Sequence, residues 1–220
     1  MKLAKKLKAD VKVNPLQSSD LLTPEEINSM IDVADTPRDK AIICTLAESG
    51  CRIGEITNCI IKFIQPLPKG GCKLILKGKT GPRTITLIKS SSYIDMWLRM
   101  HPYNNKPEDP LWITQDGKQY RGLSRGAIYS LVKRLAQKAG ITKRIHPHIF
   151  RHTRATQLIK LGWSEPKVKK FLGWSEKSNV PSLYIHLGDD DLMEDVYEMH
   201  GLIEKKKDGD GFEIGKCSKC

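Results

Sequence analysis

The hydrophobic period changes twice along this chain, and these changes restrict its fold more than any other feature. Residues 23–50 place apolar side chains at helical spacing. Residues 72–76 and 83–87 alternate with a period of two, and Gly-containing residues between them predict a hairpin turn. Helical spacing returns after residue 93. We therefore expect a mainly helical protein with a small antiparallel β-hairpin or sheet, in the α+β class.

Local signals define where several helices begin and end. Thr23, Pro24 and Glu26 are typical of a capping box with proline at the first helical position. Gly50 suits the end of a buried helix that starts near Pro37. The expected helices are 24–33, 37–50, a turn at 51–58, 93–100, 124–139, 148–161, 165–172, 179–186 and 189–199, with a long loop at 101–122.

Composition indicates the class of partner. The chain has 220 residues, 39% of them hydrophobic, which suffices for one core. Its formal net charge is +12, and this excess of Lys and Arg favours a polyanionic partner such as nucleic acid or an anionic membrane surface. No apolar run is long enough to span a bilayer, and the basic amino-terminal residues lack the apolar segment of a secretory signal. We expect a cytoplasmic protein that acts on nucleic acid rather than at a membrane.

The chain divides into three parts. We expect residues 1–20 to form a basic arm or linker, residues 21–203 one folded domain, and residues 204–220 a flexible charged tail. The tail ends in Cys217 and Cys220, a spacing that could supply half of a zinc site, whereas a structural site needs four ligands. The other cysteines are expected to be reduced thiols; they are Cys44, Cys51, Cys59 and Cys72.

The segment HPHIFRHT, residues 146–153, is the strongest candidate for chemistry. His148 and Arg151 lie three residues apart and would share one face near a helix amino end. Backbone N–H groups, the helix dipole, a guanidinium and an imidazole would then all favour a phosphate. The alternative is an ordinary basic, solvated helix end.

A second candidate is CRIGEI, residues 51–56. Arg52 follows the buried helix, and Glu55 is placed to orient it through a charge-assisted hydrogen bond. An ordinary Arg–Glu pair on a helical turn remains the alternative.

The remaining candidates are cations on the hairpin turn and two aromatic residues. Lys77, Lys79 and Arg83 could reach a DNA groove, or could simply be solvated surface residues. Trp174 and Tyr184 would ordinarily be packing residues, and nothing intrinsic distinguishes Tyr184 from the other tyrosines.

Taken in order, these segments resemble the catalytic domain of the tyrosine recombinase, or phage integrase, family over residues 21–199. The matching segments are LLTPEEI, CRIGEI, KGKTGPRTITL, HPHIFRHTRATQLIKLG, FLGWS and LYIH. Trp174 stands where many members have histidine, and its interval to Tyr184 is one residue longer than the commonest arrangement. About 20 residues precede the matched region, fewer than the amino-terminal helical domain that members commonly carry, so we expect weak, salt-sensitive DNA binding.

The resemblance implies a site-specific DNA recombinase that cleaves and rejoins strands through a covalent 3′-phosphotyrosyl intermediate, with no cofactor, metal or ATP. Its catalytic residues would be Arg52, Lys79, His148, Arg151, Trp174 and Tyr184. Glu55 would support Arg52, and the DNA contacts would come from Lys77, Arg83, His152 and Arg154. Lys77 is a rival to Lys79 for the catalytic lysine; the position before Thr-Gly-x-Arg favours Lys79.

The expected partner is double-stranded DNA, on which the resemblance implies assembly into a tetramer. Two other functions stay open: a catalytically inactive DNA-binding remnant, and strand relaxation of the type IB topoisomerase kind. A trapped covalent complex would exclude the remnant, and plasmid relaxation beside two-site recombination would separate the two enzymes.

Overall fold

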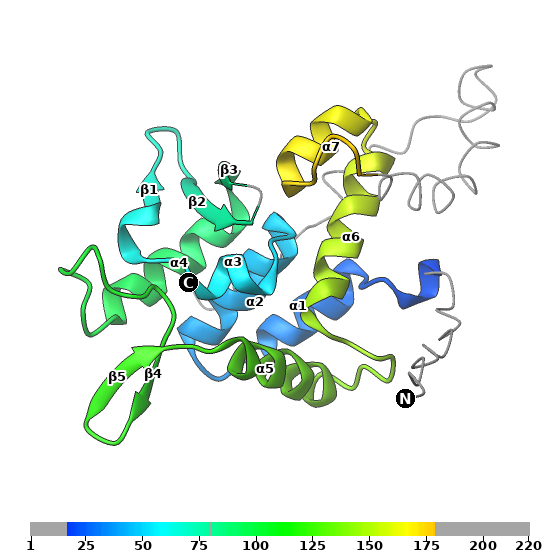
Figure 1. The fold of residues 1–220 in the computed structure, drawn as a ribbon. Coiled ribbons are helices and arrows are strands. Elements are labelled where there is room, and N and C mark those ends of the chain that lie inside the picture. The colour runs from blue at the N-terminus through cyan, green and yellow to red at the C-terminus, as the bar shows by residue number, and fades with distance from the viewer. Residues whose placement is uncertain (1–16, 80, 179–220) are drawn as a thin grey trace, which may run out of the picture.

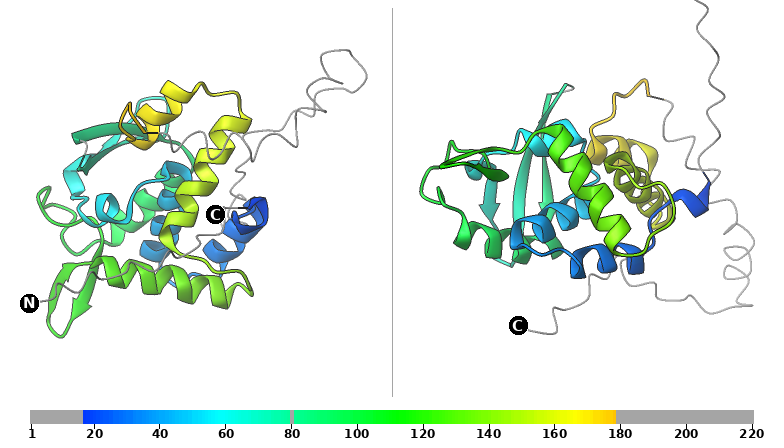
Figure 2. Two further views of the ribbon diagram at one scale, coloured as in Figure 1. Left: turned by 45° about the vertical axis from the view of Figure 1, so that its right-hand side comes forward. Right: turned by 90° about the horizontal axis from the view of Figure 1, so that it is seen from below.

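The computed structural model describes residues 17–79 and 81–178, which form seven α-helices and two small antiparallel sheets; in Figures 1 and 2 the sheets lie to one side of the central helices. The helices are α1 (Pro24–Asp32), α2 (Pro37–Ser49), α3 (Ile53–Thr57), α4 (Lys89–Met100), α5 (Arg125–Lys138), α6 (Pro147–Lys160) and α7 (Glu165–Leu172). The strands are β1 (Ile64–Pro66), β2 (Cys72–Gly78), β3 (Gly81–Leu87), β4 (Ile113–Asp116) and β5 (Gln119–Gly122). The expected α+β class is confirmed.

Helix α2 lies at the centre of the core and packs against α1, α4 and α6 (Figure 1). It is covered from several sides, so its run from Ala41 to Ala47 is buried without interruption instead of showing one apolar face. Gly50 ends this helix in the left-handed conformation, with φ 56°, as its position predicted. A Cβ at Gly50 would lie 2.8 Å from Leu172 Cδ2, so the glycine also lets the end of α7 approach α2.

The capping box predicted at the start of α1 is confirmed. Thr23 Oγ1 accepts a hydrogen bond from the Glu26 backbone N–H at 3.2 Å, and Glu26 Oε2 accepts one from the Thr23 N–H at 2.8 Å. The predicted starts and ends of α5, α6 and α7 agree with the structure to within one residue.

The central hairpin is longer than predicted. Strands β2 and β3 extend to Gly78 and Gly81, which pair with each other, so only two residues connect them. Gly81 has φ 96°, a conformation that side-chain-bearing residues rarely adopt. Strand β1, which the sequence did not reveal, pairs with β2 to complete a three-stranded sheet.

Two features were predicted wrongly: a hairpin was missed, and the start of a helix was misplaced. The expected loop at residues 101–122 contains the hairpin β4–β5, whose side chains are mostly exposed and therefore show little apolar alternation. Helix α4 begins at Lys89, not at Tyr93. The buried carboxylate of Glu48 accepts hydrogen bonds from the backbone N–H groups of Ile88 and Ser90 at 2.7 and 2.8 Å, a distant cap that sequence spacing does not show.

The expected helices at 179–186 and 189–199, the amino-terminal arm over residues 1–16 and the carboxyl-terminal tail lie outside the described residues. The four cysteines within the described residues are buried free thiols. Burial raises the pKa of Cys51 and of Cys72 to about 11, so both stay protonated near neutral pH. Among the described helices, none combines the length and apolarity needed to cross a bilayer.

Candidate active site

Three arginines from distant segments meet at the carboxyl end of α7, beside α3 and the β2–β3 hairpin. Each guanidinium donates to one of three successive backbone carbonyls: Arg83 Nε to Phe171 O at 2.9 Å, Arg151 Nη2 to Leu172 O at 2.7 Å, and Arg52 Nη2 to Gly173 O at 2.8 Å. Carbonyls at a helix carboxyl end lack partners within the helix and carry the negative end of its dipole. This end of α7 therefore gathers and partly neutralises the three cations.

Glu55 binds two of these arginines through one buried carboxylate, whose side chain is 2% exposed. Arg52 donates Nη1 to Oε1 at 3.0 Å and its backbone N–H to Oε2 at 2.7 Å. Arg83 donates Nη1 to Oε1 at 2.5 Å and Nη2 to Oε2 at 2.9 Å. Burial alone would raise the pKa of Glu55, but the hydrogen bonds from Arg83 and Arg52 outweigh it and lower the pKa, so the carboxylate is ionised.

Arg151 is buried and is fixed by three neighbours. Besides Leu172 O, its Nη1 donates to Gly50 O at 3.0 Å. The ring of Trp174 lies 5.1 Å from the Arg151 Cζ atom, within the range of a cation–π contact. Burial, followed by the charge of Arg52, lowers the pKa of Arg151 to about 10, which still leaves the guanidinium charged near neutral pH.

His148 lies one helical turn before Arg151 on α6 and is exposed, although its imidazole is partly desolvated. This desolvation, together with the positive charges of Arg151 and Arg52, lowers the pKa of His148. The neutral imidazole is therefore favoured near neutral pH and can accept a proton. Arg52, His148, Arg151 and Trp174, predicted from three separate motifs, thus belong to one cluster.

The other predicted residues are placed differently. Lys79 is exposed at the tip of the β2–β3 hairpin, and Lys77 places its ammonium 4.6 Å from the centre of the Phe63 ring. Arg154 lies against the Phe171 ring at 5.8 Å, and burial lowers the pKa of His152 to about 4. Tyr184, Cys217 and Cys220 lie outside the described residues.

Arg83 is turned inward with only 11% of its side chain exposed, although the sequence suggested a DNA contact. Its position after the turn gave no indication that it binds Glu55, because that pairing depends on how the hairpin packs against α3. Sequence reasoning also missed Gly78, where a Cβ would lie 2.6 Å from Glu55 Oε1.

Comparison with known proteins identifies the family. Residues 20–190 match the model of the phage integrase family. This chain belongs to the phage integrase family. The match covers all the described motifs and extends over Tyr184.

Curated relatives and a solved structure agree with this membership. The integrase-family chain is 30% identical over 199 residues to Transposase A from transposon Tn554 of Staphylococcus aureus, covering 84% of this chain and 53% of that protein. It is 29% identical to the tyrosine recombinase XerD of Bifidobacterium longum, covering 82% of this chain and 62% of that protein. The chain thus spans between about half and two-thirds of the curated relatives that it matches.

The fold matches the XerH site-specific recombinase bound to palindromic difH substrate in a post-cleavage complex, with a TM-score of 0.66. The two sequences are 24% identical, and the match covers 84% of this integrase-family chain and 53% of that one. At 24% identity, this similarity shows that the two chains share a fold.

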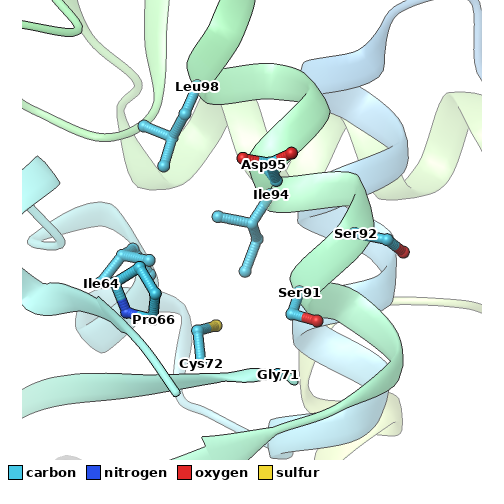
Figure 3. A pocket seen from close by; sticks show the side chains of 9 residues that line it. All are labelled: Ile64, Pro66, Gly71, Cys72, Ser91, Ser92, Ile94, Asp95 and Leu98. Atoms are coloured by element: carbon cyan, nitrogen blue, oxygen red, sulfur yellow. The ribbon is translucent and has the colours of Figure 1, made fainter. Parts of the chain in front are cut away.

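A cavity of about 230 Å³ lies away from the arginine cluster, between α4 and the ends of β1 and β2 (Figure 3). Its walls are largely apolar, with Ile64, Ile94 and Leu98 facing it and Asp95 at its edge. None of the predicted catalytic residues lines it. Within residues 17–79 and 81–178 of this integrase-family chain, no group of three or more His, Cys, Asp or Glu is arranged to hold a metal ion.

Proposed function

We propose that this chain is a site-specific DNA recombinase that cleaves and rejoins strands through a covalent 3′-phosphotyrosyl intermediate, without a metal ion or ATP. The observation that carries the proposal is the convergence of Arg52 and Arg151 on adjacent carbonyls at the end of α7. Family membership and the fold shared with a recombinase captured in a post-cleavage complex support it. A cytoplasmic location remains a prediction.

The arginines would act on the scissile phosphate. Displacement at a phosphodiester builds negative charge on the non-bridging oxygens, and guanidiniums can bind these oxygens with a forked geometry that lysine cannot copy. Arg52, with 31% of its side chain exposed, presents part of its guanidinium to an incoming phosphate. Arg151 is buried, and the Trp174 ring lies against its guanidinium, so the charge of Arg151 acts in a desolvated place.

Tyr184 would be the nucleophile. Its phenolic oxygen attacks phosphorus and forms the phosphotyrosyl bond, while the bond to the 5′-oxygen breaks. Neutral His148 would accept the phenolic proton, and Lys79 at the hairpin tip would donate a proton to the leaving 5′-oxygen. The ester bond is retained in the intermediate, so a 5′-hydroxyl from another strand can reverse the step and rejoin the DNA.

Double-stranded DNA is the proposed partner, and four copies of the chain are proposed to assemble on it. Within the cluster, three guanidiniums face one carboxylate, so it keeps a net positive charge suited to a phosphate. Lys77 is exposed on the same hairpin as Lys79 and is proposed to contact the DNA backbone. His152 and Arg154 remain weaker candidates for DNA contact, since each is partly buried.

The test is a nicked suicide substrate, which loses the short 5′-hydroxyl fragment after cleavage and traps the intermediate. The wild-type chain should form an adduct that survives denaturing electrophoresis. Tyr184→Phe should bind DNA but form no adduct, whereas the matched control Tyr197→Phe should form it normally. An adduct that persists in Tyr184→Phe would refute the nucleophile.

The same assay separates the alternatives. DNA binding without any wild-type adduct would indicate a catalytically inactive remnant. Adduct formation with plasmid relaxation, but without exchange between two sites, would indicate a topoisomerase-like activity.

A further inference from the structure

We propose that Arg83 is a positioning residue for Arg52: it occupies the carboxylate of Glu55 so that Arg52 is oriented without being neutralised. This inference rests on the proposed function and assigns Arg83 a role inside the protein instead of on the DNA. It would explain why one carboxylate is placed among three guanidiniums.

The hydrogen bonds of Arg83 show how the residue is held. Its Nη1 and Nη2 atoms form a forked pair with the two oxygens of Glu55, and its Nε atom binds Phe171 O. Both partners are internal, and the side chain is 11% exposed. Arg83 therefore links β3, α3 and the end of α7 at the place where Arg52 binds Gly173 O.

The two arginines share Glu55 unequally. Arg83 takes the forked geometry, which is the stronger one, while Arg52 makes a single side-chain hydrogen bond at 3.0 Å. If Arg83 were absent, the buried carboxylate would have Arg52 as its remaining partner, and the favourable geometry would be a forked Arg52–Glu55 pair. That pair would turn the donors of Arg52 inward and cancel much of its charge, and both changes would weaken phosphate binding.

Two glycines permit this close arrangement. A Cβ at Gly78 would lie 2.6 Å from Glu55 Oε1, and a Cβ at Gly173 would lie 2.8 Å from Arg83 Nη1. Gly173 also has φ 66°, which favours glycine there independently. The backbone of β2 and the end of α7 thus both approach the Glu55–Arg83 pair more closely than residues with side chains would allow.

The test uses Arg83→Gln, Arg83→Lys and the control Arg99→Gln, whose arginine pairs with Asp95 on the exposed face of α4. On a nicked phosphodiester substrate, Arg83→Gln should slow adduct formation by about a hundredfold, the typical effect of losing one oxyanion donor. Arg83→Lys should remain impaired, because an ammonium cannot form the fork. Arg99→Gln should react at the wild-type rate.

A methylphosphonate at the scissile position separates positioning from a merely structural role. This group lacks one non-bridging negative charge, so it depends less on the full charge of Arg52. Arg83→Gln and Arg52→Ala should each reduce the rate on the phosphodiester relative to wild type. On the methylphosphonate this reduction should be about tenfold smaller for both variants, because one contact is no longer needed. Equal losses of Arg83→Gln on both substrates would overturn the proposal. So would full rescue by a 5′-bridging sulfur leaving group, because that result would place the defect in the proton supplied by Lys79.

A measurement without DNA keeps this proposal separate from the proposed function. Inorganic phosphate titrated into the ¹⁵N-labelled wild-type chain should shift the Nε–H resonance of Arg52, and in Arg83→Gln the same shift should need about tenfold more phosphate, as for loss of about 1.4 kcal/mol. Equal phosphate affinity in both proteins would refute the role of Arg83, whether or not the chain forms an adduct. A wild-type chain that shows this shift but forms no adduct would refute only the recombinase activity.

Discussion

Replacing Glu55 with glutamine should lower the free energy of unfolding by about 3–5 kcal/mol, the usual cost of removing one partner from a buried ion pair. The carboxylate is 2% exposed and accepts four hydrogen bonds, two from Arg83, one from the Arg52 side chain and one from the Arg52 backbone N–H. Glutamine would keep one acceptor oxygen but would turn its amide NH₂ group toward these donors. Two or more of the bonds would be lost, and the three guanidiniums would face one another without an anion.

The assay is urea unfolding at pH 7 followed by tryptophan fluorescence, with Glu108→Gln as the matched control. Glu108 pairs with Lys62 at 2.5 Å, but their side chains are 70% and 47% exposed, so losing this pair should cost no more than about 1 kcal/mol. The pKa of Glu55 is lowered in the folded chain, so its contribution is present above the ordinary glutamate pKa and is lost as pH falls through the folded value. A loss for Glu55→Gln within about 1 kcal/mol of the control would refute the account of this carboxylate.

Three further predictions concern individual residues. Gly78→Ala should slow adduct formation and cost about 1–3 kcal/mol of stability, because its Cβ would overlap Glu55 Oε1. The control Gly126→Ala, whose Cβ would lie 3.8 Å from the Ser124 Oγ atom, should neither slow adduct formation nor lower stability. Equal behaviour of the two alanine variants would contradict the close approach. Burial lowers the pKa of His152 to about 4, so the free energy of unfolding should rise with pH between about 4 and 6.5, by at most about 3 kcal/mol, and His152→Asn should flatten this rise. If the free energy of unfolding from urea titrations rose with pH equally in His152→Asn and in the wild type, the assignment of this rise to His152 would be wrong. The pKa of His148 is also lowered, so single-turnover cleavage should decline only as pH falls below the ordinary histidine value, and His148→Gln should abolish this decline. Persistence of the decline in the variant would assign the proton to another group.

Helix limits were predictable from the sequence where local chemistry determines them. Thr23 and Glu26 form their cap within four residues, and Gly50 ends α2 by its own backbone conformation. The start of α4 was not predictable, because its cap is the carboxylate of Glu48 on α2. The hairpin β4–β5 was missed because an exposed hairpin has almost no apolar alternation to detect.

In the candidate site, too, local motifs were predictable from the sequence, whereas contacts that depend on tertiary packing were not. Arg52, His148, Arg151 and Trp174 were predicted from the order of their motifs, which resembles that of the family, and the structure brings them together at the end of α7. Arg83 lies in a segment that resembles a DNA-binding turn, yet it faces Glu55. A single sequence does not show whether the Arg83 side chain points inward or to solvent, because that depends on which face of the hairpin packs against α3.

Identification of the tyrosine joined to DNA would show directly whether Tyr184 is the nucleophile. Trypsin leaves Tyr184 and Tyr197 in one peptide, because no lysine or arginine lies between Lys177 and Lys205. Cleavage before Asp189 must therefore follow, with mass spectrometry of the nucleotide-bearing fragment. We expect the nucleotide on the fragment that contains Tyr184. A nucleotide on the Tyr197 fragment, or on a peptide from residues 17–178, would contradict it.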